Sequence, residues 1–161
     1  MKAKVISGLV GGLFFMLLCT SSFAQEKMLP PVTVTAKSNV SKAVTKSFEE
    51  SFKDATNTQW YKVNRRYLAD FMMKDQQNRA LFQKNGAIIY HLTYGFENNL
   101  HDDVRKLVKS NYVDYNITRA INVHQENRNI WVINIEDNKK IILVRVEEGA
   151  LEEVGNYDKS L

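Results

Sequence analysis

The sequence predicts an α+β protein with one antiparallel sheet of seven to eight strands and two helices on one face. Two amphipathic helical segments recur along the chain, and each precedes a meander of about four strand-like runs. A shift of 60 residues overlays the apolar positions of the first segment on those of the second. Two fused helix-plus-meander units give a layered single domain over residues 41–161.

Residues 1–24 are predicted to be a secretory signal peptide. Lys2 and Lys4 form a short basic start, Val5–Leu18 is an uncharged and mostly apolar run, and Ser22-Phe23-Ala24 places small residues where a signal peptidase reads. Cleavage is therefore expected near Ala24, and the mature chain is expected in the periplasm or outside the cell. The apolar run is shorter than the ~20 residues that span a bilayer, so no membrane span is expected in the mature chain.

Removal of 24 residues from the 161 leaves 137, which suits one domain of ordinary size. The only cysteine, Cys19, leaves with the signal, so no disulfide, thiol nucleophile or cysteine metal site is expected. A lipidated Cys19 is the alternative, but Leu18 stands where such sites have a small residue. With Lys2 and Lys4 removed, 20 basic and 18 acidic residues remain, well mixed, and a nucleic-acid partner is disfavoured.

Residues 25–40 form a leader or an edge strand. Both prolines of the chain, Pro30 and Pro31, precede a Val-Thr-Val-Thr alternation at Val32–Thr35. Proline cannot donate to a strand ladder, so this segment is confined to a sheet edge if it is a strand. A tether and a strand offered to a partner remain alternatives.

The first unit, residues 41–95, begins with a helix that presents Val44, Phe48, Phe52 and Ala55 on one face. Ser41 is expected to cap it, while Ser47 offers a competing capping box that would shorten it. Asn85-Gly86 is the strongest hairpin signal, since both residues accept the positive φ of a type I′ turn. The expected strands are Thr58–Val63, Arg66–Met73, Arg79–Lys84 and Ala87–Tyr94.

The second unit, residues 96–161, repeats this order. Asp102 and Asp103 lie near the positive end of its helix, whose apolar face is Leu100, Val104, Leu107, Val108 and Tyr112. A shift of 63 residues overlays Gly86 on Gly149. An internal duplication explains these overlays. The expected strands are Ile117–His124, Asn129–Glu136, Lys140–Val146 and Ala150–Val154.

A family pattern runs through both units. It comprises Phe48-x-x-x-Phe52-Lys53-Asp54-Ala55, Trp60, Tyr67-x-Ala69-x-Phe71, Ala80-x-Phe82-x-x-Asn85-Gly86-x-Ile88-Ile89, Leu100, Tyr112 and Ile117. The chain thereby resembles the secreted PepSY-like proteins of Bacteroidetes, which share the tandem architecture of the β-lactamase inhibitory protein. Two features depart from that family: His101 follows Leu100 where proline is common, and the last hairpin lacks Asn-Gly. The resemblance implies a non-catalytic binding or inhibitory module and transfers no catalytic residue.

The residues themselves offer little chemistry. His91, His101 and His124 lie on separate predicted elements without metal-ligand spacing, and no phosphate-binding loop or nucleophile elbow is present. Asp102 and Asp103 could hold a cation with His101, but the helix macrodipole explains both acids. No catalytic residue, cofactor or metal is therefore expected, and the protein is predicted not to be an enzyme.

A partner-binding surface is the main functional prediction. Several strands are apolar on both faces, while a helix layer covers only one, so part of the other face is expected to be an exposed contact site. Tryptophan, tyrosine and arginine dominate binding energy. The candidates are Trp60, Tyr61, His91, Arg119, Trp131 and Arg145. The alternative is that the aromatic residues pack in the core.

These observations favour an exported module that binds an envelope or secreted protein or peptide, with inhibition as one form of that binding. The alternative is a small-ligand carrier or an enzyme with a pocket between helices and sheet, which requires convergent polar groups. A purely structural role as an envelope spacer is a third interpretation. Edge strands allow a monomer or a weak dimer.

Overall fold

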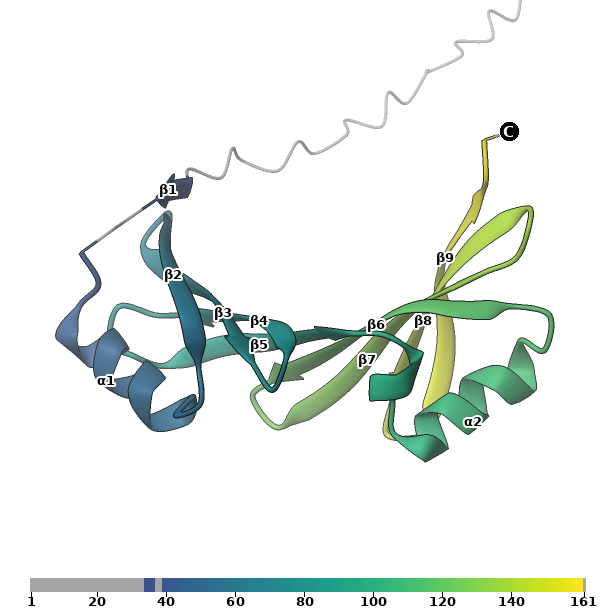
Figure 1. Ribbon diagram of the computed structural model, residues 1–161, viewed down its shortest axis with the longest axis horizontal. Helices are drawn as coiled ribbons and strands as arrows, with labels where there is room; N and C mark the ends of the chain where they lie inside the picture. The colour runs from purple at the N-terminus through teal and green to yellow at the C-terminus, as the bar shows by residue number, and fades with distance from the viewer. Residues whose placement is uncertain (1–33, 37–38, 161) are drawn as a thin grey trace, which may run out of the picture. The chain divides into compact units, whose positions relative to one another are not determined.

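The structure, a computed structural model, describes residues 34–36 and 39–160 and has the predicted α+β fold. Two helices accompany one antiparallel sheet of nine strands in sequential order (Figure 1). Eight strands belong to the two helix-plus-meander units. The ninth, β1 (Val34–Ala36), pairs with β2 at the sheet edge, and Val32 and Thr33 of the expected leader strand lie outside the described residues.

The first unit contains α1 (Lys42–Ser51), β2 (Thr56–Val63), β3 (Arg66–Met73), β4 (Gln76–Phe82) and β5 (Ile88–Gly95). The second contains the short 3-10 helix η1 (Glu97–Asn99), α2 (Asp102–Asn111), β6 (Asn116–Gln125), β7 (Arg128–Glu136), β8 (Lys140–Glu147) and β9 (Ala150–Asp158). Most strand ends agree closely with the expected ones, but β9 continues to Asp158 beyond its expected end at Val154. Among the described residues, no helix has both the length and the apolar character needed to cross a membrane.

The two helices begin differently. At α1 the hydroxyl of Ser41 accepts a hydrogen bond from the Val44 N–H (3.4 Å), so the shorter helix that Ser47 would start is not adopted. At α2 the corresponding residue is His101, whose side chain makes no capping hydrogen bond. Asp102 and Asp103 in the first turn of α2 compensate through their favourable position beside the helix N-terminus.

The turn at Asn85-Gly86 is not the expected type I′ turn. Gly86 has a positive φ of 94°, but Asn85 is not among the described residues with positive φ. Its side chain instead accepts a hydrogen bond from the Ala87 N–H (3.1 Å), and the pairing of β4 with β5 shifts register beside the turn. Two consecutive positive φ values, the requirement of type I′, occur at Lys74-Asp75 and at Glu148-Gly149.

Strand register places both helices over the same face of the sheet. Cross-strand partners share a face, and Ala80 of the α1 core lies opposite His91, which lies opposite His124. His124 and Ala120 are both on β6 with an even separation, so they also share a face, and Ala120 belongs to the α2 core. This face is the helix side; the opposite one is the helix-free side.

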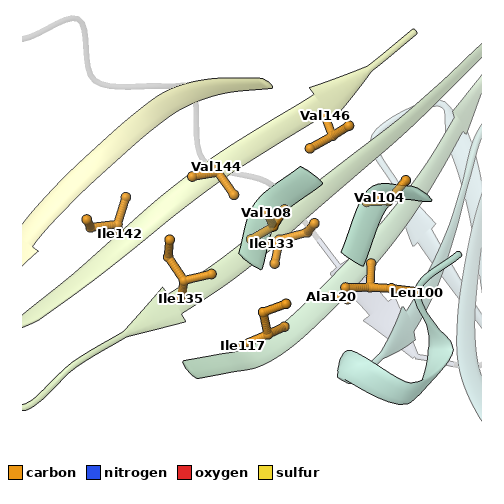
Figure 2. Close-up of a cluster of buried hydrophobic side chains, with 10 residues drawn as sticks. All are labelled: Leu100, Val104, Val108, Ile117, Ala120, Ile133, Ile135, Ile142, Val144 and Val146. Carbon is orange, nitrogen blue, oxygen red and sulfur yellow. The ribbon is translucent and has the colours of Figure 1, made fainter. Parts of the chain in front are cut away.

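The helix side carries two separate hydrophobic cores. The first core, under α1, is largely aromatic and includes Phe48, Phe52, Phe71 and Phe82. The second core, under α2, is aliphatic: Figure 2 shows Leu100, Val104 and Val108 with Ile117, Ala120, Ile133, Ile135, Ile142, Val144 and Val146 of β6–β8. Each helix therefore covers the strands that follow it in the sequence.

Candidate binding surfaces

The six residues expected to build one partner-binding surface divide between the two sides of the sheet. Trp60 lies opposite Ala69, His91 opposite Ala80, and Trp131 opposite Asn122 and Val146, all on the helix side. The other three are on the helix-free side: Tyr61, Arg119 and Arg145. The structure therefore brings no single surface together from all six.

Both tryptophans contribute to packing. The ring of Trp60 lies 5.1 Å from that of Phe48 and 5.8 Å from that of Phe82, at the border of the first core. Trp131 packs against the second core and remains half-buried, with the ring of His101 at 5.9 Å. Aromatic pairs at these separations stabilise beyond their buried area, which gives both rings a structural role.

The helix-free side holds a continuous apolar surface over β3–β8. One cross-strand row joins Leu68, Leu81 and Tyr90; a second joins Leu92, Val123 and Ile130; a third joins Tyr94, Ile121 and Val132. Leu81 and Ile130 are buried and the others half-buried, although no described helix covers them. We call this set, with Leu143 of β8, the apolar face.

Ion pairs flank the apolar face. Asp70 and Arg79 lie 2.8 Å apart, and the Arg79 guanidinium lies 5.7 Å from the centre of the Tyr94 ring. Arg145 pairs with Glu152 at 2.8 Å. The hydrogen bond that Arg79 donates to the Asp70 carboxylate raises the pKa of Arg79, which keeps its charge on the surface at neutral pH. Polar rims of this kind surround apolar contact areas in protein interfaces.

A cavity of about 430 Å³ opens at one end of the apolar face, where β5 leads into η1. Tyr94, Phe96 and Arg119 line it together with the polar ends of Gln76 and Asn99. Phe96 is 63 % exposed, which is unusual for a phenylalanine. Arg119 thus has aromatic neighbours that the sequence alone did not place beside it.

A polar strip separates the two cores on the helix side. The buried Asn78 accepts a hydrogen bond from the Thr93 hydroxyl (2.9 Å) at the same oxygen that lies 3.0 Å from His91 Nε2. The rings of His91 and His124 stack at 5.9 Å. Burial, and secondarily the charge of His124, lowers the pKa of His91 to about 4, so this ring is neutral at pH 7.

Two cavities adjoin this helix side. One of about 300 Å³ is lined by Ser51, Phe52, Ile88, His91, His124 and Glu126. The larger, about 490 Å³, lies between the first turns of α2 and the β6–β7 and β8–β9 turns; we call it the α2 cleft. The sequence pattern groups His101 with Asp102 and Asp103, but it does not indicate that Glu148 lines the same cleft. Over residues 39–160, no group of three or more His, Cys, Asp or Glu side chains is arranged to hold a metal.

No protein-family model matches the sequence, and no curated protein is similar to it. The structure is similar to a BLIP-like protein from Bacteroides fragilis, with a TM-score of 0.63, 19 % identity, and 76 % of this chain and 88 % of that chain covered. It is also similar to a DUF2874 family protein from Bacteroides ovatus (TM-score 0.63, 17 % identity, 76 % and 89 % covered). A third similar structure is that of a Bacteroides eggerthii protein whose name provisionally places it in the periplasm. Its TM-score is 0.60 at 15 % identity, with 75 % of this chain and 90 % of that chain covered.

These neighbours define the class of the fold: a BLIP-like α+β sheet. The covered share of each chain is large enough that the whole two-unit arrangement is common to them. At identities below 20 % the likeness concerns the fold alone. The resemblance to PepSY-like proteins stays a prediction.

Proposed function

We propose that the mature protein is an exported, non-catalytic binding module that engages a folded protein through the apolar face. The observation that carries this proposal is the set of cross-strand apolar rows on the helix-free side. Eight of these side chains are half-buried although no described helix covers them. Contiguous exposed apolar surface with a polar rim marks contact sites in soluble proteins.

The dimensions favour a folded protein over a small ligand. The apolar face crosses six neighbouring strands, β3–β8, which corresponds to about 24 Å at the usual ~4.8 Å strand spacing. A standard protein interface takes about 800 Å² from each partner and therefore needs a surface that extends over several strands. Tyr94, Phe96 and Arg119 at one end supply the residue types that carry most binding energy.

The comparisons support an interaction role and an envelope location. One neighbour is named BLIP-like, and another carries a provisional periplasmic name. Together with the predicted signal peptide at residues 1–24 and the PepSY-like pattern, they favour an envelope protein as partner, with inhibition as one form of engagement. The module acts as a monomer or a weak dimer.

A small-ligand carrier or enzyme with a pocket between helices and sheet is the second candidate. Two helix-side cavities favour it. Against catalysis, His91 contacts the amide of Asn78 rather than a carboxylate, so the described strip lacks a paired general acid and base.

Site-specific photocrosslinking in producing cells tests the proposal. A photoreactive phenylalanine at Val132 of the apolar face is expected to give one discrete protein adduct, whereas the same residue at Glu49, exposed on α1, is the matched control. The adduct should disappear when Arg119→Glu and Leu92→Glu are combined with the crosslinker. Adducts of equal yield at Glu49 and Val132, or an adduct indifferent to those substitutions, would contradict a specific apolar-face partner.

Export is tested separately. N-terminal sequencing of the protein recovered from the periplasm or medium is expected to begin at Gln25. A chain that retains Met1, or that carries lipid on Cys19, would overturn the predicted processing.

A further inference from the structure

The β4–β5 turn of the first unit packs closely against α1, whereas the corresponding β8–β9 turn of the second unit does not pack against α2. A Cβ atom built on Gly86 in the β4–β5 turn would lie 2.7 Å from the Ala43 carbonyl oxygen of α1. The Ser41 hydroxyl also donates a hydrogen bond to the Lys84 carbonyl (3.0 Å), which fastens this turn to the helix start. A Cβ atom on Gly149 in the β8–β9 turn would meet nothing within 4 Å. The α2 cleft occupies the space that results.

The floor of the α2 cleft is aromatic and apolar. Trp131 and Val146 are cross-strand partners at its base, and Val104 and Leu107 of α2 form one wall. In the first unit the cross-strand pair that corresponds to Trp131 and Val146 is Tyr67 and Phe82, and both are buried. Trp131 is only half-buried, so part of its ring faces the α2 cleft.

The rim of the α2 cleft is acidic. Asp103 from α2 and Glu148 from the β8–β9 turn both line it, together with His101 and the amides of Asn127 and Asn129. Neither Asp103 nor Glu148 forms an ion pair with a described residue, in contrast to Glu147, which pairs with Arg128 at 2.6 Å. The described residues of the lining include no lysine or arginine, although Arg128 lies close enough to Glu148 for that carboxylate to raise its pKa. An anion in the cleft would therefore meet two carboxylates and no lysine or arginine among the lining residues.

We propose that the α2 cleft binds an arginine side chain of a partner polypeptide. Arginine has an apolar stem that packs against Val104 and Leu107, and a planar cation that stacks on an indole ring and pairs with carboxylates. The Trp131 ring and the Asp103 and Glu148 carboxylates supply both requirements in one cavity of side-chain size. This site is on the opposite side of the sheet from the apolar face, so it goes beyond the proposed function and does not depend on it.

Nuclear magnetic resonance of the indole N–H groups tests the proposal directly. The chain has two tryptophans, and a Trp60→Phe variant assigns the signal of Trp131. Titration with the capped peptide acetyl-Gly-Arg-Gly-amide is expected to shift the Trp131 signal saturably, with a dissociation constant of the order of millimolar for a single side chain. The same peptide with citrulline, which is equally shaped and uncharged, is expected to bind at least tenfold more weakly.

The carboxylates are tested by Asp103→Asn with Glu148→Gln, which preserves shape and removes charge. At least a tenfold loss of affinity is expected, with an otherwise unchanged amide spectrum as proof of folding; Glu148→Gln alone should show a smaller loss. The matched control is Glu49→Gln with Glu50→Gln on the exposed side of α1, which should leave affinity unchanged.

Three results would overturn the proposal. Equal binding of the arginine and citrulline peptides would exclude recognition of charge. Tighter binding of free L-arginine than of the capped peptide would assign the α2 cleft to a small molecule rather than to a polypeptide. A Trp131 shift produced by inorganic phosphate but not by the arginine peptide would make the cleft an anion site.

Discussion

The two units have the same order of elements but fill their helix sides in different ways. Under α1, Phe48 and Phe52 of the helix and its end meet Phe71 and Phe82 of the sheet, with ring centres 4.8–6.5 Å apart. Under α2, valines meet isoleucines, and the one large ring on the strands, Trp131, stays half-buried at the border. One backbone arrangement thus accepts two kinds of core, and the α2 cleft lies beside the aliphatic one.

The turns show the same contrast. In the first unit the Ser41 hydroxyl both caps α1 and donates to the β4–β5 turn, so it links the helix start to the turn. In the second unit His101 makes neither bond, and the β8–β9 turn is separate from α2. Small differences at a helix start therefore decide whether a unit is closed or open.

Truncation of the aromatic core should have the largest effect. Phe71 is 1 % exposed, and Phe71→Ala is expected to lower the free energy of unfolding by about 3–5 kcal/mol. In the aliphatic core, Ile133→Val is expected to cost about 0.5–1.5 kcal/mol. Urea unfolding measures both, with the exposed Phe96→Ala as control. A loss below about 1 kcal/mol for Phe71→Ala would contradict a close-packed first core.

The glycine pair tests the closed and open turns directly. Both Gly86 and Gly149 have positive φ, so alanine costs about 1–2 kcal/mol at either position. At Gly86 the added methyl also meets the Ala43 carbonyl, which adds about 1–3 kcal/mol. Thermal or urea unfolding should therefore rank Gly86→Ala well below Gly149→Ala in stability. Equal losses would show that the first turn is as open as the second.

The polar strip between the cores predicts a pH dependence. Because the pKa of His91 is about 4 in the folded protein and ordinarily near 6.5, the unfolded chain binds the proton more tightly. Stability from this group is complete above about pH 6.5, decreases as the pH falls towards 4, and then levels off. We expect a total loss of about 1–3 kcal/mol, allowing for partial solvent screening. His91→Gln should flatten the curve in this window.

The helix starts should give the smallest effect. Ser41→Ala removes the α1 cap and the bond to Lys84, and is expected to cost about 1 kcal/mol. His101→Ser supplies α2 with the cap that it lacks, and is expected to gain up to about 1 kcal/mol. Chemical unfolding of the two variants should move in opposite directions. A lower free energy of unfolding for His101→Ser would mean that the contact between the His101 and Trp131 rings stabilises the fold more than a helix cap does.

Local patterns were sufficient for most of the fold. The alternation of apolar residues predicts β3 with the ends that the structure has, and Ser41 is the N-cap of α1 as predicted. The turn at Asn85-Gly86 was assigned the wrong geometry because its conformation depends on packing of Gly86 against α1, a contact 43 residues away at Ser41–Lys84. The residue preferences of turns depend on neighbouring residues only, so they do not reflect a contact with a helix that is distant in sequence.

The candidate surfaces were less predictable for a related reason. The side on which a strand residue points depends on register, and the bulges at β2–β3 and β6–β7 change the register within a strand. Trp60 and Tyr61 are adjacent in sequence and necessarily point to opposite sides. His91 and His124 become neighbours only because β5 pairs with β6, a pairing across the boundary of the two units.

β9 ends the sheet, and its outer backbone groups have no strand partner among the described residues. Such an edge invites association with other chains, but β9 carries Glu152, Glu153 and Asp158 and is interrupted at Val154, where its pairing with β8 shifts. These charges and this irregularity discourage fibrous stacking of one copy upon another.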